Sequence, residues 1–342
     1  MNITFLIGNG FDIGFGLNTK YSHFYDHYEG MKKEDGVPSL KEEINKDIKN
    51  WSDFEKAFGD YSKNFKKEQK EYYLQQFEDF VEKFNIYLEE EEKRFEIETS
   101  GLIPKMRKSF TEFYNIRTDD KRAIQTQYDR FGDVRIYNYI SFNYTNCLDR
   151  SISSLATSLK HNPINRIAIG EVVHIHGYIT ENMIMGVNDT NQIGNKDFAD
   201  DDEVVNEIVK PIENTIAKMS YDRRTTDLIN SSNVICIYGM SIGETDRKWW
   251  KLIANRLVSD KNCQLVILSY DNKYSTKFVH KYNKMTRKIM DTFLELSNLP
   301  SEKRKSIEPQ IHIEMNHNIF EIKAVKSDAV VASVEASPKT LI

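Results

Sequence analysis

The chain is poor in cysteine and proline, and it has no long hydrophobic run. Its three cysteines, Cys147, Cys236 and Cys263, are far apart and form no Cys-x-x-Cys pair. This pattern excludes a disulfide-stapled small domain and a cysteine-based zinc finger, and it is typical of a reducing compartment. No stretch approaches the roughly 20 apolar residues that span a bilayer, and the apolar start, residues 1–17, lacks the basic residues of a secretory signal. We therefore expect a cytoplasmic protein with no membrane contact.

The chain also lacks a strong excess of either charge. Its 342 residues include 47 Lys and Arg against 52 Asp and Glu, which gives a formal net charge of −5. A mildly acidic protein gives no electrostatic reason to bind nucleic acid. Hydrophobic residues make up 39% of the chain and aromatic residues 12%. The aromatic content still predicts a packed core, so the polarity is expected to be uneven along the chain.

The polar residues are concentrated between about residues 40 and 130, where Glu and Lys are frequent and glycine is rare. Aromatic and leucine side chains recur there at steps of three and four: Tyr73, Phe77, Phe80, Phe84 and Leu88. This is the spacing of one helix face, and such a stripe is most often part of a core. We predict a helical insertion over residues 40–130, whose stripe and acidic face leave open a binding surface for a partner protein or a second copy of the chain.

Outside this segment, short apolar runs alternate with helical patterns. The candidate strands are residues 2–7, 134–143, 166–177, 183–187, 233–239, 264–270 and 310–315. Helical patterns occupy 146–160, 203–231, the residues after Gly243, and 275–296. The alternation predicts an α/β fold with a Rossmann-like, mostly parallel sheet. We divide the chain into a discontinuous nucleotide-binding core of residues 1–39 and 131–323, the insertion, and a flexible tail of residues 324–342.

A glycine turn follows the first predicted strand, with the sequence GNGFD at residues 8–12. In α/β folds such a turn lets a phosphate approach backbone N–H groups at a helix N-terminus. The spacing departs from GxGxxG, so a tight turn with Asp12 as a helix cap is an equal alternative.

Two polar clusters follow later strands, FNYT at 142–145 and HIHG at 174–177. Asn143 can orient a ribose hydroxyl or a water molecule, because an amide both donates and accepts hydrogen bonds. Residues two apart on a strand share a face, so His174 and His176 are expected to converge as catalytic groups. A metal would need further ligands, for which Asp189 and Asp246 are candidates by position only. Helix caps and structural histidines are the alternatives.

The segment 239–246, GMSIGETD, contains a GxSxG pattern between a strand and a helix. This is the pattern of a nucleophile elbow, and the order Ser241, Asp271, His317 would complete a hydrolase triad. Most of the sheet would then precede the elbow, and the other polar clusters would have no explanation. The hydrolase is therefore the weaker hypothesis.

Together and in this order, these clusters resemble the AbiH family of bacteriophage abortive-infection proteins. The resemblance covers about residues 1–270 and includes a further motif, WSDFE at 51–55. It implies a bacterial phage-defence role, in which the infected cell is arrested or killed before the phage completes its cycle.

The same order is similar, more remotely, to the sirtuin-like NAD-binding fold. That similarity implies a pyrophosphate turn at Gly8 and Gly10 and a catalytic pair of Asn143 and His176. The other residues expected beside the nucleotide are Asn9, Phe11, Asp12, Thr145, His174, Gly239, Ser241 and Asp246. Asp12 and Thr145 depart from the residues usual at their positions. The chain also has no zinc-binding cysteine set, so protein deacylation is not expected.

These implications predict a defence effector that binds a nucleotide, with NAD as the expected ligand and cleavage of its nicotinamide–ribose bond as the expected reaction. Breaking that bond gives the ribose oxocarbenium character, as in glycoside hydrolysis. Asn143 would orient the water or hydroxyl, and His176 would act as the base. The alternatives are a non-enzymatic sensor or scaffold acting through the helical insertion, the Ser241 hydrolase, and a metal-dependent nuclease at His174 and His176.

Overall fold

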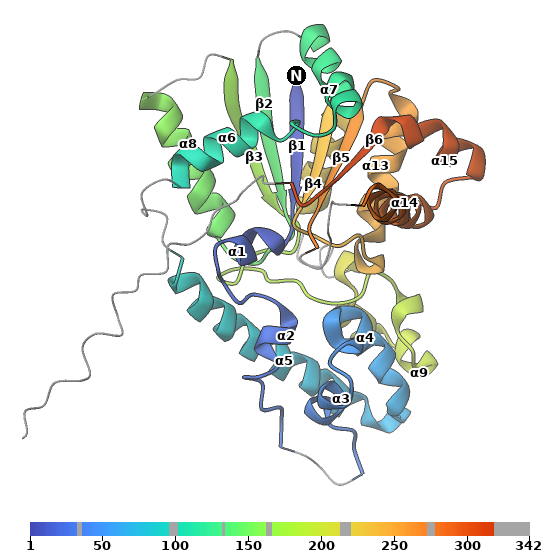
Figure 1. Ribbon diagram of the computed structural model, residues 1–342. Helices are drawn as coiled ribbons and strands as arrows, with labels where there is room; N and C mark the ends of the chain where they lie inside the picture. Colours follow the sequence, from blue (N-terminus) through green and yellow to red (C-terminus); the bar gives the residue numbers. More distant parts are fainter. Residues whose placement is uncertain are drawn as a thin grey trace, which may run out of the picture.

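The centre of the computed structural model is a six-stranded, all-parallel sheet (Figure 1). The structure describes residues 1–32, 36–95, 102–131, 134–161, 166–212, 220–271 and 278–317. The strands are β1 (Asn2–Ile7), β2 (Arg135–Ser141), β3 (Ile167–His174), β4 (Val234–Tyr238), β5 (Gln264–Ser269) and β6 (Ile311–Met315). Their spatial order is β3-β2-β1-β4-β5-β6, which is the order of dinucleotide-binding folds. The predicted α/β fold with a Rossmann-like sheet is confirmed.

One predicted strand is wrong. Residues 183–187 do not join the sheet, and Val187 forms only an isolated bridge with Val209. Ile184, Met185 and Val187 are buried all the same. A short apolar run indicates burial, but its length and periodicity do not separate a strand from a buried loop.

Helices cover both faces of the sheet. On one face, α6 (Leu102–Glu112), α7 (Thr118–Phe131) and α8 (Cys147–His161) share an apolar core with β1, β2 and β4. On the other face lie α12 (Tyr221–Ser231), α13 (Arg247–Ser259), the end of α14 (Val279–Leu296) and α15 (Ser301–Ile307). The sheet is buried between these two layers, which explains why its strands read as continuous apolar runs instead of alternating ones.

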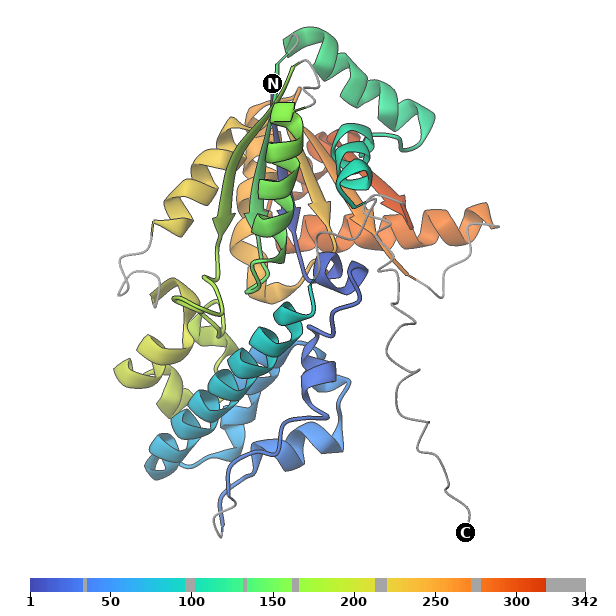
Figure 2. The ribbon, with the colours of Figure 1, turned by 90° about the vertical axis from the view of Figure 1, so that its left-hand side faces the viewer.

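A third apolar core lies beyond the carboxyl ends of the strands, in residues 21–93 and 178–212, called here the helical layer (Figures 1 and 2). Its helices are α2 (Tyr21–Phe24), α3 (Leu40–Lys46), α4 (Phe54–Tyr61), α5 (Lys70–Lys93), α9 (Lys196–Ala199) and α10 (Asp202–Ile208). The short helix α1 (Gly10–Gly14) follows β1, and 3-10 turns include η1 (Asn50–Ser52), η2 (Ser62–Asn64), η3 (Lys67–Gln69), η4 (Thr190–Gln192), η5 (Glu244–Asp246) and η6 (Glu308–Gln310). The helical layer therefore covers the edge of the sheet where nucleotide-binding folds place their ligands.

The apolar stripe of α5 is the centre of the helical layer. Tyr73 and Phe80 are fully buried, and Phe54 of α4 stacks on Phe80 with ring centroids 3.6 Å apart. The stripe is thus core, as its spacing favoured, and its side chains are covered by the protein itself.

The apolar contacts do not follow the predicted boundaries at residues 40 and 131. Helices α6 and α7 pack on the sheet, whereas α2 and the segment 178–212 pack in the helical layer. How the chain divides into domains stays a prediction, and the tail 324–342 lies outside the described residues.

The structure also bears on the expectations drawn from the cysteine content and from the lack of long hydrophobic runs. Cys147, Cys236 and Cys263 are buried and free. Among the described residues, no helix is both long enough and apolar enough to cross a bilayer.

Candidate functional site

The polar clusters meet at the carboxyl edge of the sheet because the strand ends are aligned. Ile7 of β1 pairs with Ser141 of β2 on one side and with Tyr238 of β4 on the other, and Ser141 pairs with His174 of β3. The loops that follow these four strands therefore start side by side. The position between β1 and β4 is the topological switch point, where open parallel sheets bind their ligands.

Gly8 and Gly10 hold the first of these loops against the loop after β4. Their N–H groups donate to the carbonyl oxygens of Tyr238 at 2.9 Å and of Gly239 at 2.5 Å. A Cβ on Gly8 would lie 2.3 Å from that of Met240, and one on Gly10 would lie 2.5 Å from the Cα of Gly239. The glycines are thus needed for contact between two backbones. Both amides are used inside the fold, and the pyrophosphate turn stays a prediction.

Asp12, Asn143 and Thr145 form one buried hydrogen-bonded group. The Asn143 amide donates to Asp12 Oδ1 at 3.0 Å and to the Gly8 carbonyl at 3.2 Å, and the Thr145 hydroxyl donates to Asp12 Oδ2 at 2.7 Å. Burial raises the pKa of Asp12 to about 7, although both hydrogen bonds act to lower it. Asn143 Oδ1 is buried without a hydrogen-bond partner, so it can accept from a ligand hydroxyl or a water molecule.

His174 is not part of the same site as His176. Its Nδ1 lies 2.9 Å from the Asn143 carbonyl and its Nε2 lies 2.6 Å from Asp149 Oδ2 of α8. These contacts fix the loop after β2, so the prediction that the two imidazoles converge is wrong. Asp189 caps η4 by accepting from the Asn191 N–H. Within the described ranges, no group of three or more His, Cys, Asp or Glu could hold a metal ion.

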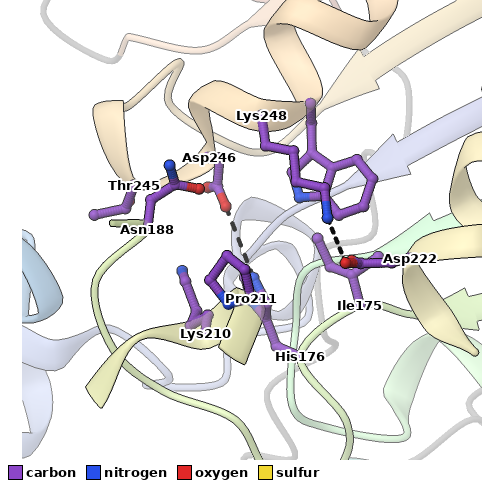
Figure 3. A pocket seen from close by; sticks show the side chains of 10 residues that line it. Ile175, His176, Asn188, Lys210, Pro211, Asp222, Thr245, Asp246 and Lys248 are labelled. Carbon is purple, nitrogen blue, oxygen red and sulfur yellow. Dashed lines mark hydrogen bonds and ion pairs between the residues drawn. The ribbon is translucent and has the colours of Figure 1, made fainter. Parts of the chain in front are cut away.

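His176 instead faces Asp246, which ends η5 before α13 (Figure 3). Its Nε2 lies 3.7 Å from Asp246 Oδ1. Both residues line a cavity of about 20 Å³ together with Lys210. Burial holds the pKa of His176 well below its usual value, and the positive charge of Lys210 lowers it further, so the imidazole is neutral. Burial also raises the pKa of Asp246.

A buried ion pair, Glu55 with Lys210, completes the site. Lys210 Nζ lies 2.8 Å from Glu55 Oε2, and both side chains are less than a tenth exposed. The Tyr144 hydroxyl lies 3.4 Å from Glu55 Oε1. Burial raises the pKa of Glu55 to about 7 although Lys210 acts to lower it. For Lys210, burial acts to lower the pKa, but Glu55 and Asp246 outweigh it and raise it.

The sequence missed both partners of this pair as site residues. Glu55 belongs to the WSDFE motif, and a carboxylate between aromatic residues could have indicated a buried charged residue. Lys210 stands alone before Pro211, and no pattern in the sequence marks it.

The family model described as "Bacteriophage abortive infection AbiH" matches residues 4–270, well over half of the chain. The chain belongs to the AbiH family. This membership supports a role in abortive infection, a defence against bacteriophage. A search of curated proteins finds no match.

Three more of the residues predicted beside the nucleotide make contacts with other parts of this AbiH-family chain. The side chain of Asn9 donates to the Thr19 carbonyl at 2.8 Å, and Phe11 is buried in the apolar core against Phe15. Gly239 has a φ of +71°, a conformation that favours glycine, and a Cβ at this position would lie 3.0 Å from the Gly10 Cα. The contacts of these residues hold the loops after β1 and β4 in place.

The structure does not assemble the Ser241 triad. Ser241 is exposed and its φ is not positive, so it lacks the strained backbone of a nucleophile elbow. His317 Nε2 donates to the Asn115 carbonyl at 3.1 Å, which turns this nitrogen to the segment before α7. The GxSxG spacing arises because Gly239 supports a backbone contact and Gly243 leads into η5.

Proposed function

We propose that this AbiH-family protein is a phage-defence effector that binds NAD at the carboxyl edge of its sheet and hydrolyses the nicotinamide–ribose bond. One observation carries the proposal: Asn143 and His176, with Asp246, lie at the switch-point edge of a sheet with the strand order of dinucleotide-binding folds. A buried polar site at this position has a known use in such folds, which is nucleotide binding.

The charge of the site fits the reaction. Cleavage leaves nicotinamide neutral and places positive charge on the ribose, so carboxylates nearby stabilise the transition state. Glu55 and Asp246 supply two carboxylates close to Lys210, and both raise its pKa. The unpartnered Asn143 Oδ1 is available to orient a ribose hydroxyl or the attacking water. His176, neutral and beside Asp246, is available as a hydrogen-bond partner that positions the water.

Binding of a whole dinucleotide requires the helical layer to move. The cavity beside His176 has a volume of about 20 Å³, roughly the space of one water molecule. Segments that cover an active site and open for the ligand are common in enzymes, because closure excludes water from the reaction. In the proposal, α4 and the segment 178–212 separate from the strand ends to admit NAD and then close over it.

The test is release of nicotinamide from NAD by the purified protein. Asn143→Ala and His176→Ala are each expected to lower the rate at least 100-fold, because each removes a group that orients or activates the water. His280→Ala, which changes an exposed histidine on α14, is the matched control and should keep the wild-type rate.

Two outcomes would contradict the proposal. Unchanged activity in both site variants would remove Asn143 and His176 from the reaction. A wild-type protein that releases no nicotinamide, and whose melting temperature does not change with NAD or ADP-ribose, would rule out this nucleotide as its ligand.

A further inference from the structure

Asp246 has a buried oxygen that no protein group satisfies. Its Oδ1 has no hydrogen-bond partner, and the nearest cationic candidate, His176 Nε2, is 3.7 Å away. A buried carboxylate oxygen without a partner costs free energy comparable to a lost hydrogen bond or more. Such an atom in a folded protein therefore indicates a donor from outside the chain.

A small cavity lies at this oxygen. It measures about 20 Å³, and its walls include Asp246, His176 and Lys210 (Figure 3). That volume holds about one water molecule, and a bound water typically makes about three hydrogen bonds. The three side chains supply a carboxylate acceptor, an imidazole and an ammonium donor, so they form a site for a single water.

Burial and a neighbouring carboxylate raise the pKa of Asp246, which lines this cavity. Lys210 is already paired with Glu55 at 2.8 Å, and among the described residues the group within 4 Å of an Asp246 oxygen that could carry a positive charge is the His176 imidazole. Asp53 at the N-cap of α4 adds a second negative charge, which raises the pKa of Asp246 beyond the effect of burial, while Lys210 acts to lower it. The Tyr144 side chain also lies near Asp246, and burial raises its pKa, so it is a neutral phenol.

The other ionisable groups at the cavity are less suited to accept a proton. Burial and Lys210 disfavour the imidazolium form of His176, so it is a weak proton acceptor. On the opposite wall, Asp222 is paired with Lys248. A general base must reach the proton it removes and have a pKa that favours taking it. The unpartnered Oδ1 of Asp246, which lines the cavity, gives the reach, and burial shifts the pKa in the required direction.

We propose that Asp246 is a catalytic residue of this site, which accepts the proton of a water held in the cavity as that water attacks C1′ of the nicotinamide ribose. This inference rests on the proposed NAD hydrolysis. The water oxygen forms a bond to C1′, and the C1′–nitrogen bond breaks with its electron pair left on the nicotinamide nitrogen. The proton moves to the Asp246 carboxylate and then to solvent. The products are ADP-ribose and neutral nicotinamide, and His176 holds the water in line.

The experiment compares Asp246→Asn with Glu244→Gln. Asn keeps the shape of the side chain but cannot accept the proton, whereas Glu244 is a half-exposed carboxylate in the same turn. We expect kcat for nicotinamide release to fall at least 100-fold in Asp246→Asn with KM changed less than threefold. Glu244→Gln should stay within twofold of the wild type.

Two further measurements separate a base from a structural carboxylate. Wild-type kcat/KM should rise with pH as Asp246 ionises, and this limb should be missing from the residual activity of Asp246→Asn. Added formate, a small external base, should raise the rate of nicotinamide release by Asp246→Ala at least tenfold. A purely structural role for Asp246 would not allow this rescue.

The outcomes distinguish the two proposals. If the wild type cleaves NAD and Asp246→Asn keeps more than a third of its rate, the role of Asp246 is overturned and the proposed function stands. If the variants do not fold, a wild-type kcat/KM with no rising limb on the acid side of its pH profile overturns it equally. If the wild type neither cleaves nor binds NAD, the proposed function fails, and this role for Asp246 fails with it.

Discussion

Asp12 is a carboxylic acid whose surroundings favour the protonated form. It is 1% exposed, and burial raises its pKa from 3.8 to about 7. The sequence suggested either a helix cap or a cofactor contact for this residue. In the structure its two oxygens accept hydrogen bonds from Asn143 and Thr145, so it joins the loop after β2 to the loop after β1.

Replacing Asp12 with Asn should change how stability depends on pH. The folded pKa lies above the unfolded one, so the folded state holds the extra proton between about pH 4 and 7, and stability falls as pH rises through that window. From pH 5 to 8 the free energy of unfolding of the wild type should fall by about 3 kcal/mol relative to Asp12→Asn. Urea unfolding at both pH values measures this difference. The same pH dependence in both proteins would show that Asp12 is already ionised in the folded state.

At the scale of elements, two neighbouring residues of helix α4 form ion pairs in different environments. Glu55 pairs with Lys210 inside the protein, whereas Lys56 pairs with Glu244 at 2.6 Å on the surface, where both side chains are about half exposed. The two pairs look alike in the sequence. Their contributions should differ, because a charge left alone is costly only where water cannot reach it.

Removing the buried cation should therefore destabilise the protein far more than removing the exposed one. Lys210→Met should lower the free energy of unfolding by about 3–5 kcal/mol, and more above pH 7, where Glu55 ionises. Lys56→Met, the matched control, should change it by less than about 1 kcal/mol. The double variant Glu55→Gln/Lys210→Met should lose less than Lys210→Met alone. Equal losses in the two Lys variants would contradict a buried pair. Chemical denaturation measures all of them.

At the scale of the whole molecule, the helical layer and the sheet depend on each other. Tyr144, from the loop after β2, is part of the helical layer's core, and the Asn146 N–H of the same loop donates to Glu92 Oε2 of α5 at 2.8 Å. The stripe of α5 is buried here, so it offers no surface to a partner. Binding of a partner protein or a second copy of the chain stays a prediction.

Deleting residues 40–93 and joining the ends with a Gly-Ser linker should prevent the rest from folding cooperatively. The deletion would expose apolar side chains that now pack against α4 and α5, among them Ile179, Phe198 and Val204. We expect dye binding to exposed apolar surface and loss of a sharp thermal transition, measured by fluorescence and circular dichroism. A soluble remainder with one cooperative transition would show instead that the rest of the chain folds without residues 40–93.

Much of the fold was predictable because its signals are local. Apolar runs ended by glycine or polar residues marked β1, β2, β3, β4, β5 and β6, and the order of the polar clusters matched the family. The false strand at 183–187 shows the limit of this evidence. Its residues are as apolar as those of a strand, and only the position of the helical layer explains their burial.

The site was predictable only in part. Asn143 and His176 lie at strand ends, where the sequence placed them, but their partners come from elsewhere in the chain. The Asn143 amide reaches Asp12 across 131 positions, and Lys210 reaches Glu55 across 155. Nothing in the spacing of the residues encodes those pairs.

The sequence by itself determined the α/β class, the parallel strands and the family, because periodicity and ordered motifs are properties of the linear chain. Only the tertiary structure decided that the Gly8 and Gly10 amides donate to backbone carbonyls, that His174 supports a loop, and that Asp246 keeps an unpartnered oxygen. The physical reason is burial. A side chain's charge, its pKa and the partners it can reach depend on what packs around it, and that is settled only when the helical layer closes over the strand ends.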